Sequence, residues 1–359
     1  MRIPPIAVIA SWPKPNYTNP QSRAPAGEVI GSMLLVLVTT ILAIRLYSRR
    51  RLTNGFGLDD TLICLAYVPA LAFTVTGIIT QRVFQWGRHL WDVEPKLFSA
   101  NILLILIHML LFDLATCLTK LSILAMVRRL TTASSNKIEH AAMLILAAIA
   151  TANSVIFLIV EIFQCWPISS AWEISEAPYS CINEEAHLMS ANIINTITDF
   201  VVVLLTIRTT MKIQLAPRQR VVVISLFGIG PIASSVGIAR TYFTWSLLTA
   251  EDYDTTWQCW YVWLSSLIEL HLGIICASIP ATKPFFARCV TSMGKLTYKR
   301  TMPLLLFESR ATRDNEHKGN SRDPGTSSFS PPTLHPADQM SLVNFTLPAI
   351  NQDPLLGGL

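Results

Sequence analysis

A nearly unbroken apolar run from Phe98 to Leu130 constrains the fold of this chain more than any other stretch. The run has no polar face recurring every 3.6 residues, as the core helix of a water-soluble protein would have. It is also longer than the roughly 20 residues that an α-helix needs to cross a bilayer. It is therefore predicted to be a membrane-spanning helix, although Asp113 and Lys120 lie inside it.

The composition of the whole chain agrees with a membrane protein. Hydrophobic residues make up 51% of the 359 residues and charged residues 14%, whereas soluble domains carry about 25% charged residues. The basic residues gather in short segments beside the apolar runs, which argues against a nucleic-acid-binding surface. The seven cysteines form no CxxC pair and no Cys/His cluster, so a metal site is not expected.

Seven apolar segments are long enough to span the membrane. They cover residues 27–46, 60–80, 98–127, 140–163, 187–207, 221–245 and 258–282. The sequence therefore predicts an all-α membrane protein, with a seven-transmembrane helix bundle over residues 27–290. The proline-rich residues 1–26 predict a flexible leader, and the polar residues 291–359 predict a disordered tail.

The distribution of Lys and Arg predicts the orientation. The segments 45–59, 128–140 and 208–220 carry four, three and four Lys or Arg residues, whereas the alternate segments 81–97, 164–186 and 246–257 carry three, none and none. The positive-inside rule then places the N-terminus outside and the C-terminal tail in the cytosol. We expect a multi-pass protein of the plasma membrane or an endomembrane, with the lipid bilayer as its main partner.

Two features of the predicted outer side concern covalent modification. Cys165 and Cys181 share the loop 164–186, where an oxidising compartment permits a disulfide. The alternative is a pair of free thiols, and the compartment favours the disulfide. Asn16 lies in an Asn-Tyr-Thr glycosylation pattern, which matters only if the N-terminus faces the lumen or the outside.

Ionisable residues inside the predicted spans are the candidate functional residues, because central charges cost about 2.5–3.5 kcal/mol on insertion scales and usually face the bundle interior. Lys120 and Asp199 could pair between helices, and Arg240 could serve an anionic ligand or the acidic outer loops. Such pairs often only fix helix packing. In an enzyme, carboxylates with a nearby histidine could instead donate or relay protons. The ligand-binding candidates of this kind are Asp113, Lys120, Asp199, Arg240 and Glu269, and the catalytic candidates are Asp113, Asp199, Glu269 and His271.

Tryptophans cluster near the predicted outer boundary, at Trp86, Trp91, Trp166, Trp172, Trp257, Trp260 and Trp263. An aromatic belt at the membrane interface is the simplest interpretation, while Trp166 and Trp172 could line a ligand mouth. The last span has no lysine at mid-depth, so a retinal Schiff base is not expected and no cofactor is predicted. The chain also lacks the P-loop, GxSxG and HExxH motifs.

Several motifs together resemble the fungal rhodopsin-domain family of seven-helix integral membrane proteins. They are the arginine-rich run 45–51 followed by Gly57-Leu58-Asp59-Asp60, and the segments 87–91, 118–124, 163–167, 195–199 and 273–281. That family includes receptor-like proteins of the Pth type and members encoded in secondary-metabolite clusters. The resemblance implies the seven-helix fold more than an activity.

Two departures from common receptors argue against conventional G-protein coupling. The third predicted span ends in Met126-Val127-Arg128-Arg129, with no acidic residue before the arginine. The last ends in Ser278-Ile279-Pro280-Ala281, without an Asn-Pro-x-x-Tyr motif.

The function predicted from the sequence is that of a receptor-like protein that binds or senses a small, apolar molecule in the outer half of the bundle. A cytosolic signalling partner would contact the basic loops and tail. Two alternatives remain open at this point. The first is an intramembrane enzyme of specialised metabolism that uses buried carboxylates, and the second is a metabolite transporter.

Overall fold

The computed structural model describes residues 5–53, 55–131, 137–172, 180–212, 217–282, 284–286 and 288. The chain divides into two units after Ser292, and the following description concerns the first. The predicted disordered tail, 291–359, lies outside the described residues.

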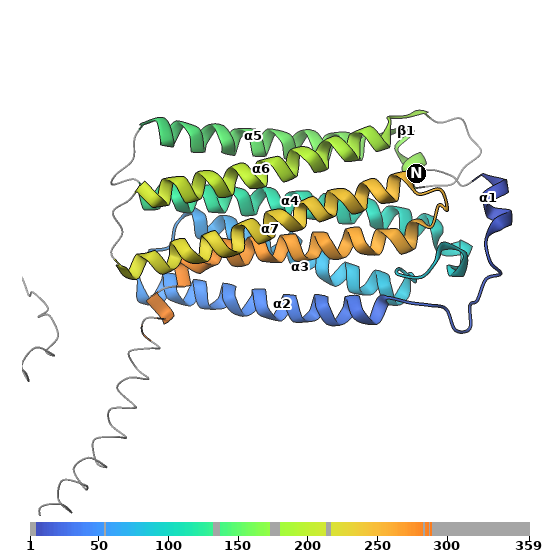
Figure 1. Ribbon diagram of the computed structural model, residues 1–359, viewed down its shortest axis with the longest axis horizontal. Helices are drawn as coiled ribbons and strands as arrows, with labels where there is room; N and C mark the ends of the chain where they lie inside the picture. The colour runs from blue at the N-terminus through green and yellow to red at the C-terminus, as the bar shows by residue number, and fades with distance from the viewer. Residues whose placement is uncertain are drawn as a thin grey trace, which may run out of the picture. The chain divides into compact units, whose positions relative to one another are not determined.

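The described part of the chain is almost entirely helical (Figure 1). Its α-helices are α1 (Ile6–Ser11), α2 (Ala24–Tyr47), α3 (Leu58–Val83), α4 (Phe98–Thr131), α5 (Lys137–Ile162), α6 (Glu184–Lys212) and α7 (Pro217–Thr249), followed by a helix over Thr255–Thr282. A π-helical turn, Ser48–Leu52, extends α2, and short 3-10 helices cover Leu90–Asp92, Pro95–Leu97 and Ile168–Ala171. The two-residue strands β1 (Cys165–Trp166) and β2 (Ser180–Cys181) pair antiparallel.

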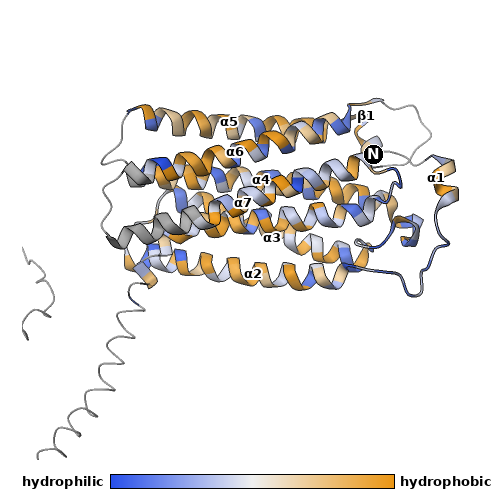
Figure 2. Cartoon of the chain, viewed as in Figure 1, coloured by the Kyte–Doolittle hydropathy of each residue, from blue (hydrophilic) through white to orange (hydrophobic). Residues whose placement is uncertain are grey.

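Six of the described helices are long and apolar enough to cross a membrane. They are Ala24–Leu52, Leu58–Val83, Pro95–Arg129, Lys137–Ile162, Glu184–Thr209 and Thr255–Thr282. Hydrophobic residues follow these helices along their length, as Figure 2 shows. Each helix begins two or three residues earlier than the sequence predicts, because prolines and acidic residues suit a first helical turn but lower the local hydropathy.

The predicted span 221–245 falls within α7, which is a long helix but is not among these six. The described structure therefore confirms the all-α class and multiple membrane-capable helices. The seven-span count and the orientation remain predictions.

Helix α4 lies centrally, packed against α3, α5 and α6. Neighbours on several sides explain why this helix needs no polar face. The most buried of the six helices is Thr255–Thr282, with 67% of its apolar window inside the structure. Its buried face includes polar residues, among them Ser266, Glu269 and His271, which require partners on other helices.

The Thr255–Thr282 helix approaches α3 closely at Gly77. A Cβ atom on Gly77 would lie 2.3 Å from Nε1 of Trp263. Only glycine therefore permits this contact between the indole ring and the α3 backbone.

One end of the bundle, here called the arginine end, is held by a buried ionic cluster around Arg45. The Arg45 guanidinium donates to Asp60 Oδ1 at 2.9 Å, to Asp59 Oδ2 at 2.9 Å and to the carbonyl oxygen of Ala277 at 2.6 Å. Ser122 of α4 donates to the carbonyl oxygen of Asp59 at 2.7 Å. The cluster thus joins α2, α3, α4 and the Thr255–Thr282 helix.

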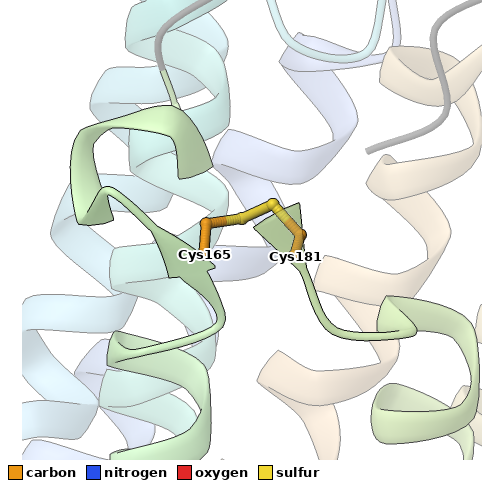
Figure 3. Close-up of a disulfide and its surroundings, with 2 residues drawn as sticks. All are labelled: Cys165 and Cys181. Carbon is orange, nitrogen blue, oxygen red and sulfur yellow. A yellow bond between two sulfur atoms is a disulfide. The ribbon is translucent and has the colours of Figure 1, made fainter. Parts of the chain in front are cut away.

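The opposite end, here called the hairpin end, carries β1, β2 and α1 (Figure 1). A Cys165–Cys181 disulfide links the two strands (Figure 3), which confirms the bridge favoured by the sequence. It ties the end of α5 to the start of α6.

The stretch 1–26, predicted to be a flexible leader, contains a short helix and contacts other parts of the chain where the structure describes it. Residues Ile6–Ser11 form α1. Nε1 of Trp12 donates to the Asp252 carbonyl oxygen at 3.1 Å, and the Trp12 ring contacts that of Trp91. The backbone nitrogen of Asn16 donates to Asp92 Oδ1 at 2.8 Å. These contacts with residues far along the chain hold the segment, and they could not be inferred from its proline-rich composition.

Candidate functional site

A cavity of about 160 Å³ opens between the helices in the hairpin-end half of the bundle. It is named here the hairpin-end cavity. Its walls are mainly apolar and come from α3, α4, α5, α6, α7 and the Thr255–Thr282 helix. They include Phe73, Met109, Phe112, Phe157, Leu188 and Trp263. Glu184 and Glu185, at the start of α6, also line it.

The lining of this cavity includes Arg240 of α7, a residue that is only 3% exposed. Its Nε donates to Glu269 Oε2 at 2.8 Å, and its Nη1 donates to Asn192 Oδ1. The guanidinium carbon also lies 4.7 Å from the ring centre of Phe112. Nη2 has no hydrogen-bond partner among the described residues.

Glu269 continues a polar network away from the cavity. Its Oε1 accepts from Asn195 Nδ2 at 3.2 Å, and the same amide nitrogen lies 3.4 Å from Asp199 Oδ2. Lys120 Nζ donates to Asn195 Oδ1 at 2.7 Å and to Thr198 Oγ1 at 2.9 Å, and it lies 3.1 Å from Asp199 Oδ1. The Lys120–Asp199 pair expected from the sequence is therefore present.

This network, named here the interhelical network, runs from Arg240 to Lys120 across α4, α6, α7 and the Thr255–Thr282 helix. It contains two cations and two carboxylates, so its formal charges cancel. A charge in a membrane interior is tolerated when it is paired in this way. A smaller cavity of about 60 Å³ adjoins the network at Lys120, Asp199 and Glu269.

Two of the ionisable site residues predicted from the sequence lie outside the interhelical network. Asp113 accepts a hydrogen bond from Ser154 of α5. His271 is fully buried, where its Nδ1 lies 2.8 Å from the Leu267 carbonyl oxygen and its Nε2 lies 3.4 Å from Thr74 Oγ1. The structure thus gives His271 a contact to α3 rather than to the carboxylates Asp199 and Glu269.

The two tryptophans that could line a ligand mouth, Trp166 and Trp172, lie outside the lining of the hairpin-end cavity. Trp166 is 77% exposed on the hairpin, and neither Trp166 nor Trp172 is among the residues that line the hairpin-end cavity. Trp86 and Trp263 line it instead. Trp86 stacks on His108 with ring centres 5.4 Å apart, and Trp263 stacks on Phe73 at 6.4 Å.

Sequence reasoning missed Asn192, Asn195 and Thr198 as partners of the buried charges. A signal was nevertheless present, because positions 192, 195 and 199 follow one another at helical spacings of three and four. The Thr255–Thr282 helix shows the same signal at Cys259, Val262, Ser266 and Glu269. Residues with this spacing share one face of a helix.

A second, larger cavity of about 650 Å³ lies beside the hairpin-end cavity and shares Ile105 and Thr255 with it. The N-terminal segment contributes Trp12 and Tyr17 to its wall. Asn16, the predicted glycosylation site, is exposed nearby. Its Oδ1 accepts hydrogen bonds from Thr18 Oγ1 and from the backbone nitrogen of Asn19.

Comparison with known proteins identifies the family. The family model described as the fungal rhodopsin domain matches residues 44–288. The chain belongs to this family. That span contains the Arg45 cluster, the disulfide and the whole interhelical network, and it confirms the resemblance drawn from the motifs.

Three curated relatives are named as a biosynthesis cluster protein, a receptor and a membrane protein. The chain is 25% identical over 288 residues to the Wortmanamides biosynthesis cluster protein C of Talaromyces wortmannii, covering 79% of this chain and 76% of the relative. It is 21% identical over 289 residues to Receptor GIN3 of Arthrobotrys oligospora, covering 80% and 67%.

A SAT4 family membrane protein of Emericella nidulans is 25% identical over 200 residues, covering 56% of this chain and 50% of the relative. No solved structure gave a significant match. Together with the six membrane-capable helices, the family match shows a multi-pass membrane protein.

Proposed function

We propose that this protein binds a small, mainly apolar molecule in the hairpin-end cavity and responds to it as a receptor. The observation that carries the proposal is an apolar cavity with a buried, paired arginine on its wall. Ligand sites commonly combine apolar walls with a few placed polar groups. The likeness to Receptor GIN3 supports a receptor-like role.

The proposal includes α7 as the seventh span and the hairpin end as the outer side. The disulfide supports this orientation, because such bonds persist in oxidising compartments. The basic arginine end would then face the cytosol, in agreement with the positive-inside rule. A cytosolic partner would contact that end.

Two helices could carry a response between the two ends. Helix α4 contributes Lys120 to the interhelical network and Ser122 to the Arg45 cluster. The Thr255–Thr282 helix contributes Glu269 and Ala277 in the same way. A ligand that shifts either helix would therefore act on both polar clusters.

Retinal is not part of this proposal. A Schiff base needs a lysine at the ligand, and the described lining of the hairpin-end cavity contains none. The Lys120 ammonium is instead occupied by Asn195, Thr198 and Asp199.

An intramembrane enzyme of specialised metabolism is the second candidate, favoured by the likeness to a biosynthesis cluster protein. Asp113, Asp199 or Glu269 would then be the proton donor. Deleting the gene should abolish a product, and restoring a Glu269→Gln variant should fail to bring it back. Normal product formation by that variant would exclude Glu269 as the donor.

Binding itself is tested on the purified full chain in lipid nanodiscs. A ligand that binds only the folded state raises the unfolding temperature in proportion to its saturation. We expect small neutral aromatic compounds to stabilise the wild type saturably. Val262→Trp, which fills the cavity, should remove the effect, while Leu204→Trp on an exposed face of α6 should not. Equal stabilisation of both variants would show that the compounds act through the lipid.

A further inference from the structure

Unpaired hydrogen-bond donors on the hairpin-end cavity indicate the chemical class of its ligand. Nη2 of Arg240 and the Nε1 atoms of Trp86 and Trp263 have no hydrogen-bond partner among the described residues, although all three residues are only 3% exposed. All three residues line the cavity. A buried donor without an acceptor is costly, so an oxygen acceptor on the ligand would satisfy a need that the protein leaves open.

The charges around Arg240 favour a neutral acceptor over an anion. Glu269 already lies 2.8 Å from Arg240, and Lys120 is matched by Asp199. A carboxylate on the ligand would add an unmatched negative charge to a neutral network in an apolar setting, which is unfavourable. A cationic group on the ligand would be repelled by the positive charge of Arg240.

The size and walls of the cavity limit the rest of the molecule. Its volume of about 160 Å³ is close to that of an engineered apolar cavity of roughly 150 Å³ that binds benzene. Phe73, Phe112 and Trp263 supply aromatic surfaces around this space. The part of the ligand that enters is therefore about the size of one ring.

We propose that the hairpin-end cavity binds a neutral molecule with a ring-sized apolar portion and a carbonyl-type oxygen that accepts a hydrogen bond from Arg240 Nη2. This inference rests on the proposed function, because it concerns the same cavity. It adds the ligand class and the residue that selects it.

Three probes of one size separate the possibilities. They are acetophenone, which has a neutral carbonyl, ethylbenzene, which lacks the acceptor, and benzoate, which carries a charge. Each is titrated against the full chain in nanodiscs by the fluorescence of the tryptophans, two of which line the cavity. Hydrogen bonds to charged donors are strong enough that acetophenone should bind about tenfold more tightly than ethylbenzene. Benzoate should bind more weakly than acetophenone.

Arg240→Lys tests the role of the arginine while keeping its charge next to Glu269. The variant loses the planar guanidinium fork, so we expect the preference for acetophenone over ethylbenzene to fall to about threefold or less. Trp86→Phe keeps a smaller aromatic ring and removes Nε1, and it reports the contribution of that donor. Unfolding temperatures of both variants show whether they are folded.

The outcomes distinguish the two proposals. Equal binding of acetophenone and ethylbenzene, or a preference unchanged in folded Arg240→Lys, would overturn the acceptor inference while cavity binding stands. Tighter binding of benzoate would overturn the neutral class. Saturable binding of no probe in the wild type would remove the proposed site itself, and with it this inference.

Discussion

Replacing Arg240 with methionine should destabilise the protein strongly, because it leaves Glu269 buried without its cation. Glu269 is 6% exposed, and among the described residues the hydrogen bond that remains to it comes from the Asn195 amide at 3.2 Å. Removing one partner of a buried ion pair costs about 3–5 kcal/mol. A central charge on insertion scales costs about 2.5–3.5 kcal/mol. We therefore expect Arg240→Met to lower the free energy of unfolding by about 3 kcal/mol.

The double variant Arg240→Met/Glu269→Met is the matched control, since it removes both charges together. Replacing a whole buried pair by apolar residues is often neutral, so we expect its unfolding free energy to return to within about 1 kcal/mol of the wild type. The assay is reversible unfolding of the full chain in mixed micelles, with Glu269→Met completing the cycle. Additive losses in the double variant would refute the reasoning that Arg240 and Glu269 act as one pair.

Three further predictions concern other parts of the fold. Gly77→Ala places a Cβ 2.3 Å from Trp263 Nε1, so it should lower the free energy of unfolding by about 1–3 kcal/mol. Gly228→Ala is the control, because a Cβ there would have nothing within 4 Å, and it should cause no loss. Similar values for the two variants would contradict the close contact at Gly77. Cys165→Ser should cost about 3 kcal/mol for a loop of this length, and reducing agent should bring the wild type to the same stability. Asn16→Gln should remove a glycan mass from protein made in fungal cells, and an unchanged mass would argue against glycosylation of Asn16.

The length and apolar character of the helices could be predicted from the sequence because both follow from the thickness of the bilayer. The apolar run Phe98–Leu130 corresponds to α4, which the structure places at Phe98–Thr131. The Lys120–Asp199 pair could also be predicted, since a charge inside a membrane needs an opposite charge at a similar depth. The disulfide followed from two cysteines in one loop.

The composition of the site could not be predicted in the same way. Hydropathy does not say which face of α6 turns toward α7, and this rotation decides that Asn192 meets Arg240. Trp86 looked like part of an interfacial belt, but it is 3% exposed and stacks on His108. The N-terminal segment contacts Trp91 and Asp252, which lie far along the chain, so no local pattern encodes these contacts.

The central claim is that the hairpin-end cavity binds a neutral aromatic carbonyl compound beside Arg240. Photolabelling tests this claim most directly. An acetophenone that carries a trifluoromethyl diazirine would be crosslinked to the full chain in nanodiscs and mapped by mass spectrometry. We expect labels on Met109, Phe112 or Val262, which line the cavity, competed by unlabelled acetophenone and lost in Val262→Trp. Labels confined to exposed positions such as Leu204, without competition, would contradict the account.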